Sequence, residues 1–131
     1  MGWIRMEETM KKILVVDDED AILFAFSRVL MQPNIEVHTA QTLNEALDLL
    51  NKNVYDAVIA DLRLSGTTSN DGYTVIQKTA ESQKECRIIV MTAYGDEKTK
   101  ETVFSLGADF YLEKPVSPNK VKELIASMGI Y

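Results

Sequence analysis

The sequence reads Ile13-Leu14-Val15-Val16-Asp17-Asp18 close to its N-terminus, an apolar run of strand length that ends in two acids. A second, mostly apolar run, residues 55–60, ends in Asp61. If these runs are neighbouring strands of a parallel sheet, their carboxylates meet at one edge. Carboxylates a few ångströms apart repel one another and cannot all ionise without a partner. We therefore predict a hard divalent cation at this edge, above all Mg²⁺, which binds carboxylates, water and phosphate oxygens.

Two further runs of strand length end in side chains that suit a phosphate group. Residues 87–91 are followed by Thr92-Ala93, a hydroxyl beside a small residue. Residues 109–113 are followed by Lys114-Pro115, an ammonium before a proline. An acid pair, a single Asp, a Thr and a Lys, each at a strand end, form a constellation typical of phosphoryl transfer, in which positioning and charge neutralisation matter most.

Amphipathic segments alternate with the predicted strands. Residues 20–31 have apolar side chains at helical spacing, and residues 35–39 alternate as a strand does. The other four helices are predicted from signals at their ends. Thr42 and Glu45 form a capping box at the start of one helix, and Asp71-Gly72 and Ser117-Pro118 each start another. The remaining helix has Asp96 as its cap and ends at Gly107. Five strands alternating with five helices predict an α/β fold with a doubly wound parallel sheet. Such sheets bind ligands at the carboxyl ends of their strands.

Composition is consistent with one globular domain. The chain has 131 residues, of which 46% are hydrophobic, so it can bury a core. Its formal charge of −6 argues against direct binding of nucleic acid or of an anionic membrane. A single cysteine, Cys86, fits a reducing cytoplasm, and no apolar run approaches the roughly 18 residues of a membrane span.

At the strand ends the chain resembles the receiver domain of two-component response regulators. The resemblance rests on Asp17-Asp18-Glu19, Asp61-Leu62-Arg63-Leu64, Thr92-Ala93 and residues 107–115. It implies a CheY-like (flavodoxin-like) fold with five parallel strands in the order 2-1-3-4-5. Residues 12–131 are then the receiver domain, and residues 1–11 are an N-terminal tail or an expression remnant.

The resemblance also implies roles for the acids. Asp61 corresponds to the phosphoacceptor, which takes a phosphoryl group from a sensor histidine kinase or a phosphotransfer protein. Asp17 and Asp18 correspond to the acidic pair that holds Mg²⁺ or Mn²⁺. Asp61 and the backbone carbonyl of Arg63 complete the protein's share of this metal shell.

Three other side chains correspond to the parts that respond to phosphorylation. Lys114 matches the cation that pairs with the phosphoryl oxygens, and its bond to Pro115 is expected to be cis. Thr92 matches the hydroxyl that moves towards the phosphoryl group, and Tyr111 the aromatic ring that follows it inward. The readout surface is then the 96–128 face, which would act on an output domain or a downstream protein. A homodimer through this face is another option, which no specific residue supports.

Each of these residues has a less specific interpretation. Asp18 alone has about even odds of being only a helix cap. Thr92 alone suits a turn, and Lys114 alone suits a solvated surface. Tyr111 without the resemblance is about twice as well explained by core packing.

Two other function classes remain open. A phosphatase with an aspartyl-phosphate intermediate needs a second Asp where Arg63 stands, so turnover of an external substrate is not expected. The domain would only assist its own phosphorylation and dephosphorylation. A docking module that is never phosphorylated stays open, because the 65–71 loop is longer than usual and Ser65 replaces the common proline. As a separate hypothesis, Tyr94 and Arg63 flank the path of attacking water and slow the loss of the phosphoryl group.

Overall fold

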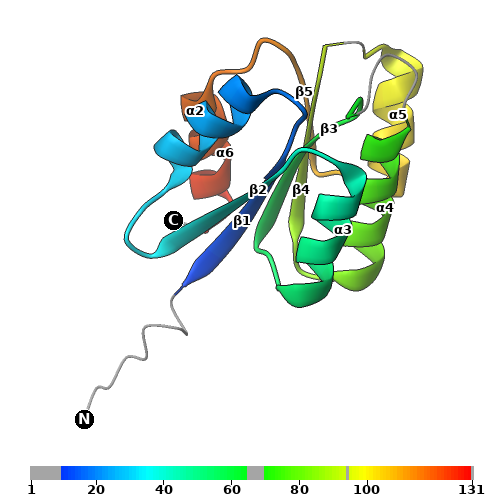
Figure 1. Ribbon diagram of the computed structural model, residues 1–131. Helices are drawn as coiled ribbons and strands as arrows, with labels where there is room; N and C mark the ends of the chain where they lie inside the picture. The colour runs from blue at the N-terminus through cyan, green and yellow to red at the C-terminus, as the bar shows by residue number, and fades with distance from the viewer. Residues whose placement is uncertain (1–9, 65–69, 94, 131) are drawn as a thin grey trace.

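The computed structural model describes residues 10–64, 70–93 and 95–130, and this part of the chain forms one sheet between two layers of helices (Figure 1). The parallel strands lie in the order β2-β1-β3-β4-β5. This confirms the predicted α/β fold and strand order. The described strands are β1 (Lys11–Val16), β2 (Ile35–Ala40), β3 (Ala57–Asp61), β4 (Arg87–Thr92) and β5 (Phe110–Glu113). The described helices are α2 (Asp20–Leu30), α3 (Leu43–Lys52), α4 (Asp71–Ser82), α5 (Glu97–Leu106) and α6 (Pro118–Ser127).

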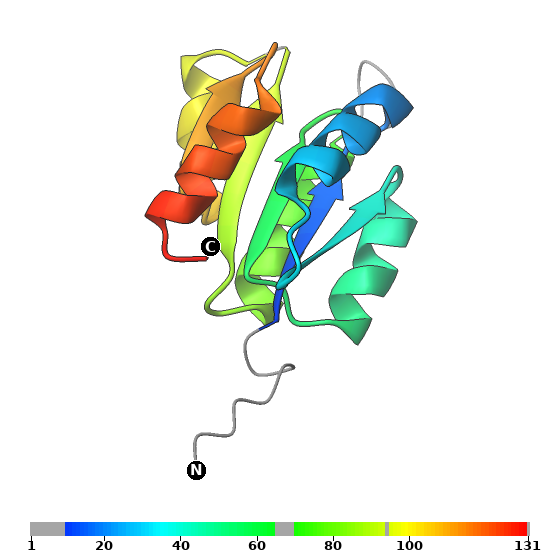
Figure 2. The same ribbon diagram turned by 90° about the vertical axis from the view of Figure 1, so that its left-hand side faces the viewer.

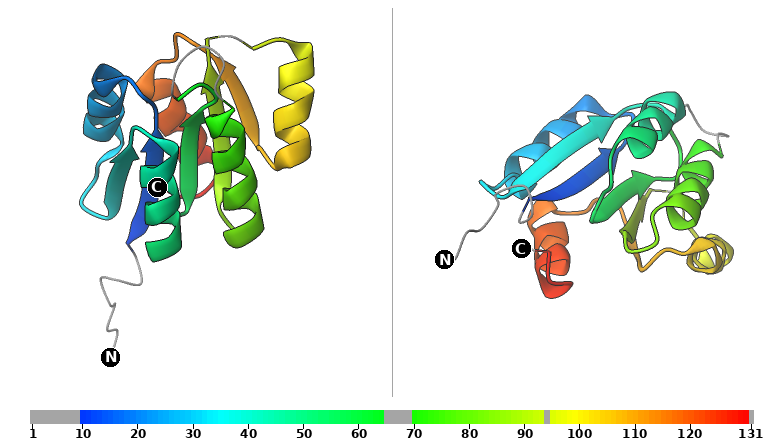
Figure 3. Two further views of the ribbon diagram at one scale, coloured as in Figure 1. Left: turned by 45° about the vertical axis from the view of Figure 1, so that its right-hand side comes forward. Right: turned by 90° about the horizontal axis from the view of Figure 1, so that it is seen from below.

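Helices cover both faces of the sheet. Figure 2 looks onto the face covered by α2 and α6, and α3, α4 and α5 lie on the other side, as the view from below in Figure 3 also shows. Strand β1 is fully buried from Ile13 to Val16. Ile13 and Val15 pack in the cluster that includes α2 and α6, whereas Leu14 and Val16 pack in the cluster that includes α3. This two-sided burial explains why the strand sequence is continuously apolar.

The helix ends largely follow their predicted chemistry. The Thr42 hydroxyl accepts the Glu45 N–H at 3.2 Å, and the Glu45 carboxylate accepts the N–H of Gln41 rather than that of the cap residue. Asp96 caps α5, and Gly107 ends it with a φ of 119°. The predicted cap of α6 at Ser117, followed by proline, is also confirmed.

The register of the sheet brings the candidate site together. Val16 of β1 is the partner of Ala60 of β3, so Asp17 and Asp61 are the next residues on adjacent strands. Thr92 of β4 is the partner of Glu113, which precedes Lys114. Strand order reverses between β1 and β3, which is where open α/β sheets bind their ligands.

The domain boundary stays a prediction, because residues 1–9 lie outside the described part of the chain. Among the helices that the structure describes, none has the length and apolar character needed to cross a bilayer.

Candidate phosphoryl-transfer site

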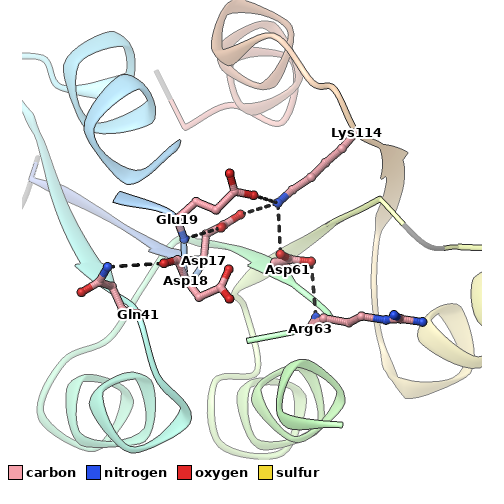
Figure 4. Close-up of polar contacts among 7 residues, drawn as sticks. All are labelled: Asp17, Asp18, Glu19, Gln41, Asp61, Arg63 and Lys114. Carbon is pink, nitrogen blue, oxygen red and sulfur yellow. Dashed lines mark hydrogen bonds and ion pairs between the residues drawn. The ribbon is translucent and has the colours of Figure 1, made fainter. Parts of the chain in front are cut away.

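The carboxyl edge of the sheet holds a cluster of acids (Figure 4). Asp17 is fully buried and Asp61 nearly so, whereas Asp18 and Glu19 are exposed. Carboxylate oxygens of Asp17, Asp18 and Glu19 all lie within 4.8 Å of one another. The N-cap residue of α2 is Glu19, so the interpretation of Asp18 as the cap of this helix is wrong.

Lys114 lies between the two buried acids. Its Nζ donates hydrogen bonds to Asp17 Oδ2 at 2.8 Å and to Asp61 Oδ2 at 3.0 Å, and it lies 3.7 Å from Glu19 Oε1. Only 12% of the Lys114 side chain is exposed, so the interpretation as a solvated surface cation is wrong. The predicted cis bond between Lys114 and Pro115 is confirmed.

Both buried acids use their second oxygen in the same way. Asp17 Oδ1 accepts the N–H of Glu19 at 2.9 Å, and Asp61 Oδ1 accepts the N–H of Arg63 at 3.4 Å. Each carboxylate is therefore held on one side by the backbone two residues ahead and on the other by Lys114. Both carboxylates therefore face the Lys114 ammonium at the strand ends.

Burial and charge shift the ionisation of the site. Burial raises the pKa of Asp61, because the nearby ammonium of Lys114 only partly offsets the loss of hydration. Partial burial raises the pKa of Asp18, and the Asp17 carboxylate raises it further. Burial alone would lower the pKa of Lys114, but its hydrogen bonds to Asp17 and Asp61 outweigh burial and raise the pKa. The site thus combines a firmly charged cation with an excess of carboxylates.

Thr92 and Tyr111 lie on the β4–β5 side of this cluster. Thr92 is buried, and its carbonyl accepts the N–H of Lys114 at 2.8 Å, which joins the two strand ends. Tyr111 is half-buried, and burial raises its pKa. The structure therefore brings Asp17, Asp61 and Lys114 into direct contact and links Thr92 to them through the backbone.

Three residues that shape the site had no role in it predicted from the sequence. Glu19 approaches Lys114, and its place beside the acid pair was an available signal. Gln41, which follows β2, donates from Nε2 to Asp20 Oδ1 at 2.5 Å and to the carbonyl of Asp18 at 3.5 Å. Nothing in the sequence indicates that contact.

Gly72 is the third missed residue, at the start of α4. A Cβ atom placed on it would lie 2.3 Å from the Asp61 carbonyl oxygen and 2.3 Å from Leu62 Cα. Glycine therefore lets the helix pack directly against the backbone that positions Asp61. Tyr94 and residues 65–69 lie outside the described residues, so the hypotheses on Tyr94 and on the longer loop stay predictions.

Comparison with known proteins identifies the family. A family model described as response regulator receiver domain matches residues 13–126. The transcriptional regulatory protein SrrA of Staphylococcus aureus is 38% identical over 110 residues, which are 84% of this chain and 44% of SrrA. The chain thus spans less than half the length of the curated relatives it matches.

Solved structures agree with this match. A CheY-like receiver domain protein from Methanospirillum hungatei JF-1 has a TM-score of 0.82 at 28% identity, covering 91% of this chain and 93% of that one. A response regulator from Burkholderia pseudomallei, solved with a phosphorylated aspartic acid, a calcium ion and citrate, has a TM-score of 0.76 at 26% identity, covering 92% and 74%. The chain therefore belongs to the response regulator receiver domains, the phosphorylation-controlled switches of two-component signalling.

Proposed function

We propose that this domain accepts a phosphoryl group on Asp61 from a sensor histidine kinase or a phosphotransfer protein, in a reaction that depends on Mg²⁺ (or Mn²⁺). The observation that supports this most is the position of Lys114, which donates to Asp17 at 2.8 Å and to Asp61 at 3.0 Å. A cation held against the acceptor is available to neutralise incoming phosphoryl oxygens.

The donor atoms fit a hard divalent cation. Asp17, Asp18 and Asp61 offer carboxylate oxygens, and the Arg63 carbonyl is proposed as the fourth protein ligand. The Lys114 ammonium pairs with Asp17, Asp61 and Glu19, and Asp18 adds a further carboxylate to this cluster, so among these described residues acids outnumber the lysine. Mg²⁺ at this site would neutralise phosphoryl oxygens and orient them for transfer.

The transfer itself requires little from the protein beyond position and charge. An Asp61 oxygen forms a bond to phosphorus while the bond between phosphorus and the donor's histidine nitrogen breaks, and the bonding electrons leave with the imidazole. Backbone hydrogen bonding from Arg63 holds the attacking carboxylate. Lys114 then exchanges contacts with the carboxylates for contacts with the phosphoryl oxygens.

Phosphorylation adds about two negative charges and new acceptor oxygens to Asp61. We propose that the Thr92 hydroxyl moves towards these oxygens and that Tyr111 follows, which changes the 96–128 face. That face would act on an output domain or a downstream protein in the cytoplasm, and a homodimer through it is a further option. The domain is proposed to turn over no external substrate.

The test is acyl-phosphate formation. The domain is incubated with acetyl phosphate and Mg²⁺, and intact mass is compared for wild type, Asp61→Asn and the exposed control Asp48→Asn. We expect one added phosphoryl group in wild type and control, none in Asp61→Asn, and none in EDTA. A phosphoryl group added to Asp61→Asn would refute the assignment of Asp61 as the acceptor. A protein that binds Mg²⁺ yet takes no phosphoryl group from acetyl phosphate or from phosphoramidate would favour the docking module instead.

A further inference from the structure

Gly95, in the segment between β4 and α5, lies against the tip of Tyr111. A Cβ atom placed on Gly95 would lie 1.3 Å from Tyr111 Oη, 2.5 Å from Tyr111 Cζ and 3.0 Å from Thr92 Cγ2. Cβ atoms do not approach other heavy atoms below about 3.0 Å. The volume that any side chain at position 95 would need is therefore already filled by the tyrosine.

The requirement for glycine here is one of space and not of backbone conformation. Among the described glycines, only Gly107 and Gly129 have positive φ angles. Gly95 is not among the glycines with the left-handed φ that alanine avoids. The contact is made with the end of a side chain, which can rotate away, so a methyl group at position 95 would displace Tyr111 and leave the backbone in place.

The Tyr111 hydroxyl is buried, and within the described part of the chain it has no hydrogen-bond partner. An unpaired buried hydroxyl is unfavourable. The space left by Gly95 and the nearby methyl group of Thr92 limit where this hydroxyl can lie. The ring packs against the apolar cluster that contains Val90 and Val103, which anchors the body of the side chain.

We propose that Gly95 is a positioning residue of the switch, because the space it leaves holds Tyr111 beside Thr92. Thr92 ends β4 and is joined to Lys114 by a backbone hydrogen bond, whereas Tyr111 lies in β5, next to α5 (Figure 1). The space at Gly95 thus couples the strand ends at the site to the surface that reports phosphorylation. Its signalling consequence rests on the function proposed above. A methyl group at position 95 uncouples the two while Asp61 still accepts phosphate.

The test compares wild type, Gly95→Ala, Tyr111→Ala and the double variant by NMR with ring-labelled tyrosine, Tyr111 being assigned with Tyr111→Phe. In the unphosphorylated wild type we expect a nuclear Overhauser contact between the Tyr111 ring and the Thr92 methyl group. Gly95→Ala should lose this contact, and the Tyr111 pKa should fall towards that of an exposed tyrosine. With Ala at position 111, adding Gly95→Ala should cause a much smaller change at Thr92, because only the 3.0 Å approach to Thr92 Cγ2 remains.

Retention of the Tyr111–Thr92 contact in Gly95→Ala would overturn the proposal, whatever the state of Asp61. The same samples are then treated with acetyl phosphate and Mg²⁺. Gly95→Ala should still gain a phosphoryl group but show no phosphorylation-dependent change at Tyr111, and a change equal to that of wild type would also overturn it. If no protein becomes phosphorylated, wild type included, the proposed function is refuted. The NMR contact between Tyr111 and Thr92 then still decides whether Gly95 positions Tyr111.

Discussion

Replacing Lys114 by methionine tests the view that its ammonium neutralises the buried carboxylates of Asp17 and Asp61 at the strand ends. The substitution keeps a long unbranched side chain and removes the charge that Asp17 Oδ2 and Asp61 Oδ2 contact at 2.8 and 3.0 Å. Lys52 provides a matched control, because its Nζ lies 3.0 Å from Asp48 Oδ2 on the surface of α3, with the two side chains 68% and 60% exposed. The two lysines differ in burial far more than in bond length.

The expected loss follows from that burial. Removing one partner of a buried ion pair destabilises a protein by about 3–5 kcal/mol. The loss of stability has an upper limit, because a carboxylate that has lost its lysine partner can bind a proton instead. Protonation at pH 7 costs about 4 kcal/mol for a carboxyl group with an ordinary pKa. We expect Lys114→Met to lose about 3–5 kcal/mol at pH 7, against about 0.3–0.5 kcal/mol for Lys52→Met.

The assay is urea denaturation followed by far-UV circular dichroism, in EDTA, at several pH values. At pH 5 the cost of protonating each carboxylate falls to about 1.5 kcal/mol, so the loss of stability in Lys114→Met should be smaller than at pH 7. Mg²⁺ should restore part of the stability at pH 7, since it supplies positive charge to the same acids. A deficit no larger than that of Lys52→Met, or one that does not change with pH, would refute the view that Lys114 neutralises buried carboxylates.

Three further predictions concern single residues. Burial raises the pKa of Asp61 above its ordinary value of 3.8, so the contribution of this carboxyl to folding stability is largest below pH 3.8 and is lost as the pH rises through the folded-state pKa. In EDTA, Asp61→Asn should therefore match the stability of wild type in acid and become the more stable protein towards pH 7, as urea denaturation midpoints will show. Gly72→Ala should lose about 3 kcal/mol and slow phosphorylation, because its contacts at 2.3 Å are with backbone that cannot rotate away; a melting temperature like that of wild type would contradict this. Tyr111→Phe should keep or raise the urea midpoint, because it removes a hydroxyl without a partner among the described residues; a loss of about 1 kcal/mol would instead reveal a hydrogen bond to that hydroxyl.

The sheet and the place of the site could be predicted because they follow from regular patterns. Apolar runs such as Ile13–Val16 indicate buried strands, and the topology of parallel sheets brings Asp17 and Asp61 to one edge. The position of Lys114 was predicted from the family resemblance, because hydrophobic periodicity does not indicate where a lysine that follows a strand points. Its 12% exposure and its two acidic partners required the structure.

Other contacts had no signal in the sequence because they join loops that only the folded chain brings together. Gln41 reaches the backbone of Asp18 from the neighbouring strand end, and Gly95, which follows β4, meets the tip of Tyr111 on the adjacent strand β5. Such contacts depend on ångström-scale positions of side chains far apart in the chain. Helix caps such as Thr42 were predictable because cap and partner are only three residues apart.

The hydrogen bond from the Gly72 N–H to the Leu62 carbonyl, 3.1 Å long, has a consequence for how this domain tolerates change. It joins the two ends of the segment between β3 and α4, immediately after Asp61, the proposed phosphoacceptor. Because the entropic cost of closing a loop rises only slowly with its length, insertions in this segment need not move Asp61. We therefore expect that loops from related domains can replace this segment without moving Asp61, so that the proposed recognition of upstream partners could be redesigned separately from the site at the strand end.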